Sequence, residues 1–165
     1  MSTLPSNASH QVGVAAFVLN DQGQVLAVQE KNGPLRGSGT WKMPSGIINQ
    51  GEDIHSVREV KEETGIETDF LEVIGFRQGR QVLFEKSDLF FLCVLRPRTS
   101  IIEKQDSEIE AAKWMDLEEF AGQTFFENNV GRNMMEVCIA ITKGGYRGFG
   151  MEFLSIGTFY PNARN

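Results

Sequence analysis

The sequence predicts an α/β fold, an α/β/α sandwich built around a mixed β-sheet. Strand-like and helix-like segments alternate irregularly along the 165 residues, a length typical of one domain. Two strand-like segments, 11–20 and 24–31, are separated only by turn-forming residues, so we expect them to form a β-hairpin. Because the chain does not follow a strict β-α-β repeat, a doubly wound parallel sheet is not expected.

Six segments have the apolar, β-branched and aromatic composition of strands. They are 11–20, 24–31, 41–48, 68–78, 87–97 and 108–115. The first two are joined by the turn Asn-Asp-Gln-Gly, and the third is interrupted by Pro44. The Gly-rich stretch 32–40 is predicted to be a loop, and another loop is expected around Gly79.

Three segments are predicted to be helical, namely 53–64, 116–122 and 128–143. In the first, Ile54, Val57 and Val60 recur every three residues between charged side chains. Gly65 supplies a C-terminal stop for this helix. The stretch 144–165 is rich in Gly and Phe, and its pattern assigns no element.

Residues 1–9 are rich in Ser, Pro and Asn and are predicted to be a flexible tail, followed by a single domain at 10–165. The first ten residues have neither the basic start nor the apolar core of a signal peptide. No run approaches the roughly 18 apolar residues of a membrane helix. We therefore expect a cytoplasmic protein without membrane contact, and an organelle location stays open if a longer precursor exists.

The charge balance bears on the possible partners. A net charge of −6 and a pI near 5.0 argue against a nucleic-acid polymer, because such binding relies on basic residues that displace counterions. An acidic chain can still bind a small phosphate compound if metal cations lie between them. Cys93 and Cys138 lie in apolar runs, so we expect two buried free thiols.

The predicted helix 53–64 has an unusually acidic face. Glu59, Glu62 and Glu63 stand at positions i, i+3 and i+4, and such positions share one side of a helix. One interpretation is a solvated acidic surface. The alternative is a site for a hard cation, because the helix has an apolar face with which to dock and follows a Gly-rich loop. Carboxylate oxygens at this spacing suit Mg²⁺ or Mn²⁺.

The stretch 46–66 resembles the Nudix box, the signature of Nudix hydrolases. That pattern is Gly, five residues, Glu, seven residues, then Arg-Glu-aliphatic-x-Glu-Glu-x-Gly-aliphatic. Gly46 and Glu52 match the first part at the expected spacing. The second part is matched in full by Arg58, Glu59, Val60, Glu62, Glu63, Gly65 and Ile66.

Further similarity lies in the segments QVGVAAFVLNDQGQVLAVQEK, WKMP, EKSDLFFLCVL and AAKWMDLEEF. Together these segments look like the plant Nudix hydrolases that act on ADP-ribose and NADH, and the resemblance covers roughly 10–145. Such relatives often carry a further N-terminal domain, whereas this chain looks like the Nudix domain alone. The resemblance implies a Nudix-type sandwich fold and, as a partner, a second copy in a homodimer.

The match departs from the family pattern at one place. Five residues, 53–57, separate Glu52 from Arg58 where the pattern has seven. Two residues missing from a helix rotate the preceding part by about 200° and shift it by about 3 Å. We place the gap between Ser56 and Val57. Because the apolar stripe can survive, we expect the fold to be affected less than the activity.

The resemblance implies a role for each residue of the box. Glu59, Glu62 and Glu63 would bind Mg²⁺ or Mn²⁺, helped by the carbonyl of Gly46. Arg58 would hold a glutamate in place through a charge-assisted hydrogen bond. The metal would polarise a diphosphate and lower the pKa of a water that attacks phosphorus.

Two roles stay open at this point. Glu52 would either brace the loop or join the outer shell of the metal. The general base would be Glu59 or Glu62 within the box, or Glu108 outside it, because many Nudix enzymes place a glutamate about six residues before a Trp such as that in AAKWM. The alternative for Glu108 is a solvent-facing strand residue.

Three residues outside the box are candidates for substrate binding. Phe17 and Trp41 could stack on an adenine or nicotinamide ring, although core packing is the alternative for both. Arg77 could hold a ribose or a terminal phosphate, with a solvated surface position as its alternative.

The predicted function is a metal-dependent pyrophosphohydrolase. It would cleave a nucleoside diphosphate linked to another moiety, with ADP-ribose or NADH as leading substrates, to AMP and a phosphorylated product. The alternative is a Nudix scaffold whose shortened box has impaired catalysis and which acts as a nucleotide-binding or protein-interaction module.

Overall fold

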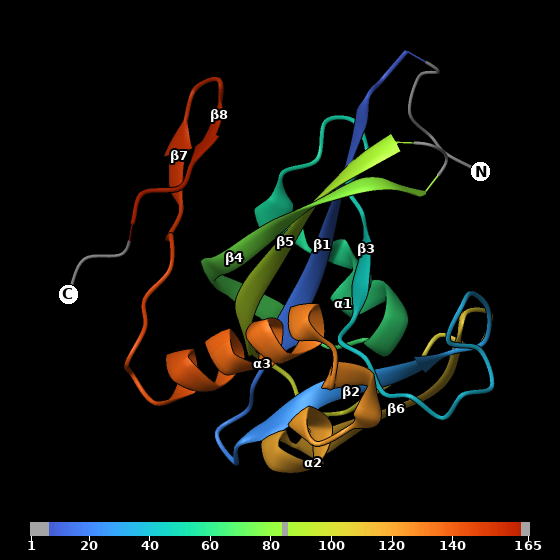
Figure 1. Ribbon diagram of the computed structural model, residues 1–165. Coiled ribbons are helices and arrows are strands. Elements are labelled where there is room, and N and C mark those ends of the chain that lie inside the picture. The colour runs from blue at the N-terminus through green and yellow to red at the C-terminus, as the bar shows by residue number, and fades with distance from the viewer. Residues whose placement is uncertain (1–6, 84–85, 163–165) are drawn as a thin grey trace.

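The computed structural model describes residues 7–83 and 86–162, which form a four-stranded and a two-stranded β-sheet flanked by helices, and a small C-terminal hairpin (Figure 1). The larger sheet has four strands in the order β3-β1-β5-β4. Their bounds are β1 His10–Val18, β3 Ser45–Ile47, β4 Thr68–Leu83 and β5 Lys86–Pro97. β1 runs parallel to β5, whereas β1–β3 and β4–β5 are antiparallel, so the predicted mixed sheet is confirmed.

The predicted hairpin of the first two strands is wrong. β2 (Gln24–Glu30) leaves the larger sheet and pairs with β6 (Ile109–Asp116) in a separate two-stranded sheet. The connecting turn does form, and one bridge joins Leu19 to Val25. Both edges of β1 are already occupied by β3 and β5, so β2 has no partner edge there and continues to β6.

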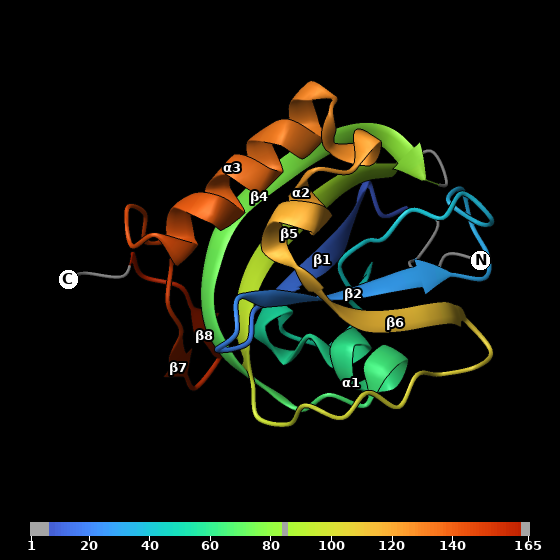
Figure 2. The same ribbon diagram turned by 90° about the horizontal axis from the view of Figure 1, so that it is seen from below.

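The two sheets lie between two helical layers, which Figure 2 shows on opposite sides of the strands. One layer holds α2 (Leu117–Ala121), the 3-10 helix η2 (Thr124–Phe126) and α3 (Asn129–Thr142). The other holds the 3-10 helix η1 (Ile54–Ser56) and α1 (Arg58–Thr64). The predicted α/β/α arrangement is confirmed.

The alternation of side chains along β1 creates a core on each face of the sheet. Ala15 and Phe17 belong to the apolar cluster beneath α2 and α3, and Phe17 is fully buried. Val14, Ala16 and Val18 belong to the cluster beneath α1. A one-residue shift of this strand would exchange the two cores, so its register is strongly specified.

The helix predicted at 53–64 is broken in two. η1 ends at Ser56, and α1 begins at Arg58 after Val57, whose φ of 24° is positive. A positive φ is unfavourable for a β-branched residue. The apolar stripe is nevertheless present, since Val57 and Val60 are buried and Ile54 packs against the same core. The shortened connection is thus absorbed in the backbone of one residue, while the buried face is retained.

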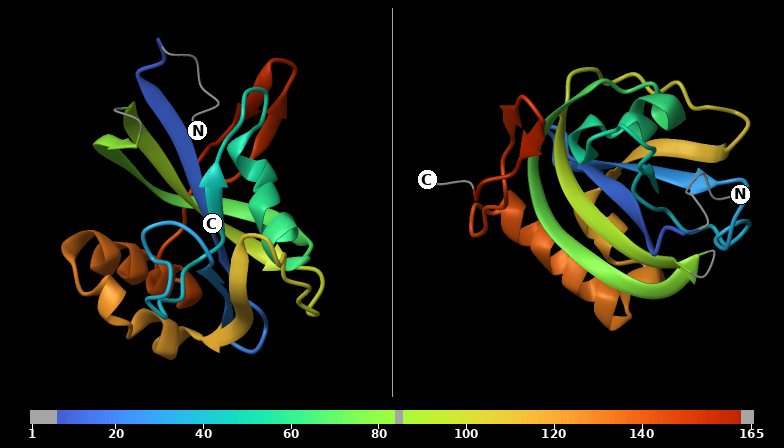
Figure 3. Two further views of the ribbon diagram at one scale, coloured as in Figure 1. Left: turned by 90° about the vertical axis from the view of Figure 1, so that its right-hand side faces the viewer. Right: turned by 90° about the horizontal axis from the view of Figure 1, so that it is seen from above.

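The C-terminal part forms an element that the sequence pattern does not assign. β7 (Glu152–Leu154) and β8 (Gly157–Phe159) make a small antiparallel hairpin, which lies beside η1 (Figure 3). The predicted tail at 1–9 falls mostly outside the described residues, which begin at residue 7.

The two cysteines are buried and free as expected, and burial raises the pKa of each thiol to about 12. None of the helices in 7–83 and 86–162 combines the length and apolar content that crossing a bilayer requires.

Candidate active site

The acidic face of α1 lies against β3, and a glycine permits this contact. A Cβ atom at Gly46 would overlap the side chain of Glu59, so no other residue fits there without a shift. At its other end α1 stops at Gly65, which adopts the left-handed conformation and donates its amide to Lys61 O at 2.9 Å. The box glycines therefore position the acidic face at both of its ends.

Arg58 gathers three carboxylates at the start of α1. Its Nε lies 2.7 Å from Glu52 Oε1, and its Nη1 lies 3.0 Å from Glu59 Oε1 and 2.7 Å from Glu62 Oε2. Glu52 also accepts a 2.8 Å hydrogen bond from the amide of Asn49. Glu52 therefore braces the loop between β3 and η1, and Arg58 links that loop to the acidic face.

Glu63 is the most deeply buried of these carboxylates. Its residue is 5% exposed, and its Oε2 has no hydrogen-bond partner among the described atoms. Burial raises the pKa of Glu63 to about 8, although the charge of Lys42 opposes this rise. An unpaired buried carboxylate oxygen is costly, so this atom calls for a positive partner.

Burial also raises the pKa of Glu59. The charge of Arg58 opposes this effect, and the negative charges of Glu62 and Glu108 add to it. Glu108 therefore lies within electrostatic reach of the acidic face, as it also does for Glu63. It reaches that place because it directly precedes β6, and its carbonyl accepts a 2.9 Å hydrogen bond from the amide of Lys31.

The charged groups around α1 form one cluster, made up of Glu30, Lys42, Glu52, Arg58, Glu59, Glu62, Glu63 and Glu108. The sequence does not predict two of them, Lys42 and Glu30. Lys42 Nζ lies 2.6 Å from Glu30 Oε1, and both charges act on Glu63. The main chain of Lys42 is paired to Val28 by two 2.9 Å hydrogen bonds. The available signal for Lys42 is its place in the WKMP segment, shortly before the box glycine. Glu30 reaches the cluster because β2 pairs with β6 on one side and with the main chain of Lys42 on the other.

The cluster does not form a ready-made cage for an ion. No group of three His, Cys, Asp or Glu residues in the described ranges has the arrangement of a metal site. Arg58 and Lys42 instead neutralise the nearby carboxylates. The donor set still suits a hard divalent cation, because it consists of carboxylates and includes the unpartnered oxygen of Glu63.

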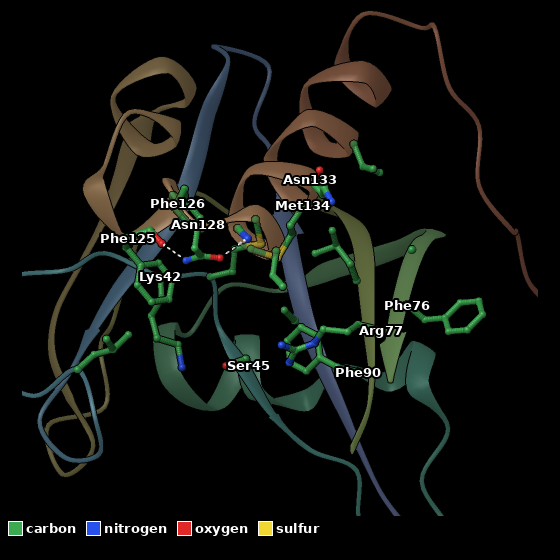
Figure 4. Close-up of a pocket in the computed structure, with 18 residues that line it drawn as sticks. Lys42, Ser45, Phe76, Arg77, Phe90, Phe125, Phe126, Asn128, Asn133 and Met134 are labelled. Carbon is green, nitrogen blue, oxygen red and sulfur yellow. Dashed lines mark hydrogen bonds between the residues drawn. The ribbon is translucent and has the colours of Figure 1, made fainter. Parts of the chain in front are cut away.

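A cavity of about 740 Å³ adjoins this cluster. It lies between the larger sheet and the layer of η2 and α3, and Lys42 and Ser45 line the wall shared with the β3 region (Figure 4). Its other walls are mainly apolar, with polar groups at Arg77, Asn128 and Asn133. This combination of size, apolar walls and a few polar groups is typical of a small-molecule site.

The structure separates the three candidates for substrate binding. Arg77 lines the cavity, with its guanidinium 5.3 Å from the ring centre of Phe90 and 3.6 Å from Asp88. Phe17 is buried in the core, so it cannot stack on a ligand in this conformation. Trp41 packs against the same core and does not line the cavity, while Lys113 covers its ring at 4.7 Å.

Aromatic rings do line the cavity at three other positions that the sequence did not single out. These are Phe90, Phe125 and Phe126, whereas the side chain of Phe76 points away from it (Figure 4). Phe90 stands on β5 two residues from Asp88, and both face Arg77. The alternation of β5 was the available signal, because it places these two residues on one face.

The sequence is similar to named plant and animal proteins. It is 51% identical over 170 residues to Nudix hydrolase 2 of Arabidopsis thaliana, covering 99% of this chain and 61% of that protein. It is 39% identical over 163 residues to Nucleoside diphosphate-linked moiety X motif 6 of Xenopus laevis, covering 96% and 72%. Against Nudix hydrolases 2, 6 and 5 of Arabidopsis, the chain spans 61%, 54% and 51% of their lengths.

Solved structures share the fold at lower identity. A NUDIX hydrolase from Nitrosomonas europaea superimposes with a TM-score of 0.63 at 24% identity, covering 79% of this chain and 88% of that chain. The NUDIX domain of Shewanella oneidensis NrtR, complexed with ADP ribose, gives a TM-score of 0.65 at 18% identity, covering 82% and 90%. The NUDIX domain family itself matches residues 9–137. With the box residues gathered around the buried carboxylate of Glu63, this match shows that the chain belongs to the Nudix hydrolase family.

Proposed function

We propose that the protein is a divalent-metal-dependent pyrophosphohydrolase that cleaves a nucleoside diphosphate linked to another moiety. One observation carries the proposal. A cluster of carboxylates around the buried Glu63, one oxygen of which has no partner among the described atoms, adjoins a 740 Å³ cavity through Lys42. Buried carboxylates with perturbed pKa values at the edge of a cavity are typical of a catalytic site.

The metal in this proposal is Mg²⁺ or Mn²⁺. Glu59, Glu62, Glu63 and the carbonyl of Gly46 would hold it. When bound, it would supply positive charge to the diphosphate oxygens and lower the pKa of a bound water. Deprotonated carboxylates favour binding of the cation, so the raised pKa of Glu63 makes loading depend on pH.

The protein's own residues perform the remaining tasks. Arg58 fixes the directions of Glu59 and Glu62 through its ion pairs. Lys42 faces the cavity and contributes a positive charge next to the position of a substrate phosphate. The general base is Glu59, Glu62 or Glu108, and a raised pKa makes Glu59 a stronger proton acceptor.

ADP-ribose and NADH are the proposed substrates, with AMP and a phosphorylated remainder as products. The cavity falls within the range of about 300–1,000 Å³ that is common for small-molecule sites. The complex of the NrtR domain with ADP ribose supports a nucleotide of this class as a ligand of the shared fold. Arg77, with Phe90 beneath it, offers a positive and aromatic surface at the end of the cavity beyond Ser45.

A second candidate function is a scaffold that binds nucleotide without cleaving it. The break at Val57 favours this reading, because it shortens α1 to seven residues at the point where the acidic face begins. The ion pairs of Arg58 with its three neighbouring glutamates also favour the scaffold. The guanidinium already neutralises these carboxylates, which opposes the binding of a metal cation to them.

An assay with purified protein separates the two functions. AMP is quantified by chromatography after incubation with ADP-ribose or NADH, with and without Mg²⁺ or Mn²⁺. The Glu62→Gln variant serves as the background control. Metal-dependent AMP that vanishes in the variant supports the hydrolase, whereas ADP-ribose binding by calorimetry without AMP supports the scaffold.

A further inference from the structure

The C-terminal segment 144–162 is fixed along the outer edge of β4. Val73 and Phe149 exchange two main-chain hydrogen bonds of 2.8 Å. Glu72 accepts a 2.6 Å hydrogen bond from the amide of Gly148, and it pairs with Arg147 Nε at 2.9 Å. A Cβ atom at Gly148 would overlap the main chain of Val73, so the approach requires glycine. These contacts place the β7–β8 hairpin at a defined position.

From that position the hairpin lies beside η1, just before α1 in the chain, as Figure 3 shows. Thr158 Oγ1 donates a 3.0 Å hydrogen bond to Asp53 Oδ2. The hydroxyl of Tyr160 lies 3.3 Å from His55 Nδ1. The ring of Phe153 meets His55 edge to face, with 5.4 Å between the ring centres. Asp53 and His55 of the shortened stretch are thus held by Phe153 and Thr158 of the hairpin and by Tyr160, which directly follows it.

The stretch that the hairpin contacts has little local stabilisation of its own. Val57 has a positive φ, and no described side chain caps the start of α1. A helix of seven residues is also too short to be stable by its own hydrogen bonds. The start of α1, and with it Arg58, therefore depends on contacts made by residues 53–55.

We propose that the β7–β8 hairpin and the residue directly after it position α1 for catalysis, with Phe153, Thr158 and Tyr160 as positioning residues. They hold Asp53 and His55, which fixes the path of the chain into Val57 and Arg58. This inference rests on the proposed function, because it assigns the hairpin to the same site. The hairpin carries out through tertiary contacts what a continuous helix would do through its own backbone.

The test uses the full chain with the paired substitution Thr158→Val and Tyr160→Ala. Hydrogen exchange of the α1 amides, Mn²⁺ affinity by electron paramagnetic resonance, and kcat and KM for ADP-ribose are measured. The Ile156→Ala variant is the matched control, because Ile156 is 96% exposed in the same hairpin. We expect faster exchange in α1, and Mn²⁺ affinity and kcat lower by about 10- to 100-fold, with KM changed less than about threefold. The single variant Tyr160→Phe should lose much less Mn²⁺ affinity and kcat than the paired variant, because it keeps the ring that packs against Phe70.

Insertion of two alanines after Ser56 distinguishes positioning from general stabilisation. In the lengthened chain α1 can join η1 as one helix, so the paired substitution should no longer lower Mn²⁺ affinity or kcat. Unchanged exchange in α1 and unchanged Mn²⁺ affinity in the paired variant would overturn the inference. So would an equal loss with and without the insertion. If the parent protein releases no AMP, the proposed function fails, while the exchange of the α1 amides still decides whether the hairpin positions the helix.

Discussion

The helices on the two sides of the sheets are fixed in different ways. α3 has 14 residues, and the side chain of Asn128 caps its start by accepting a 2.8 Å hydrogen bond from the amide of Gly131. α1 has seven residues, follows a residue with positive φ, and owes its position to the ion pairs of Arg58 and the contact at Gly46. The former helix follows local rules of stability, whereas the latter depends on tertiary contacts and gathers buried charge, as expected for a functional element.

The largest expected effect concerns the buried charge on α1. Glu63→Gln should lower kcat/KM for ADP-ribose by at least about a hundredfold, because it removes a proposed metal ligand. The melting temperature without metal should stay equal or rise, since an amide carries no buried charge. Activity and thermal unfolding are measured in parallel, with the exposed Glu118→Gln as the control. Equal activity of the two variants would contradict this role for Glu63.

The pKa of Glu63 should make the stability contributed by α1 depend on pH. Its folded-state pKa of about 8 lies above the ordinary value of 4.5, so the folded protein keeps a proton that the unfolded chain releases. Without metal, the contribution of Glu63 to the free energy of unfolding should be fully present below about pH 4.5. It should be lost, by on the order of a few kcal/mol, as the pH rises through about 8. Urea unfolding of the parent and of Glu63→Gln measures this loss, which the variant should not show. Mn²⁺ should reduce the loss in the parent, because its binding favours the charged carboxylate.

Lys42 tests the connection between the cluster and the cavity. Lys42→Met should lower kcat/KM by about 10- to 100-fold, because it removes the positive charge that faces the proposed phosphate position. The matched control is Lys61→Met, whose lysine lies on α1 at the protein surface and pairs with Glu67 at 3.2 Å. Steady-state kinetics of both variants make the comparison. A loss of the same size in both would mean that general charge, and not the position of Lys42, is responsible.

The smallest expected effect concerns α3. Asn128→Ala removes the capping hydrogen bond and should lower the free energy of unfolding by about 1 kcal/mol. It should leave Mn²⁺ affinity unchanged, because α3 contributes no carboxylate to the cluster. Urea unfolding and Mn²⁺ titration together measure this separation. If Asn128→Ala also lowered Mn²⁺ affinity, the prediction that α3 and the carboxylates on α1 act independently would be wrong.

Local patterns in the sequence predicted most strands and the acidic face, because these depend on short-range periodicity. The partner of β2 could not be obtained in this way. The turn after β1 resembles a hairpin turn, and only the occupied edges of β1 direct β2 to β6. The convergence of Glu30 and Glu108 follows from that distant pairing, so it was equally hidden.

The shortened box illustrates a different limit. Counting residues between Glu52 and Arg58 located the irregularity close to Val57, where the helix breaks. The count could not indicate that residues 153–160 contact this stretch, because those contacts join segments far apart in the sequence. This C-terminal region has no regular apolar period, and so its role was not visible in the sequence.

The main chain of Lys42 is hydrogen-bonded to Val28 in both directions, at 2.9 Å each. The site of this residue is thus determined by backbone atoms that every amino acid except proline possesses. Its side chain can change during evolution without displacing the strand that carries the box glycine. The charge that the proposed substrate phosphate would meet can therefore change at a single position, while the backbone around the proposed metal site keeps its course.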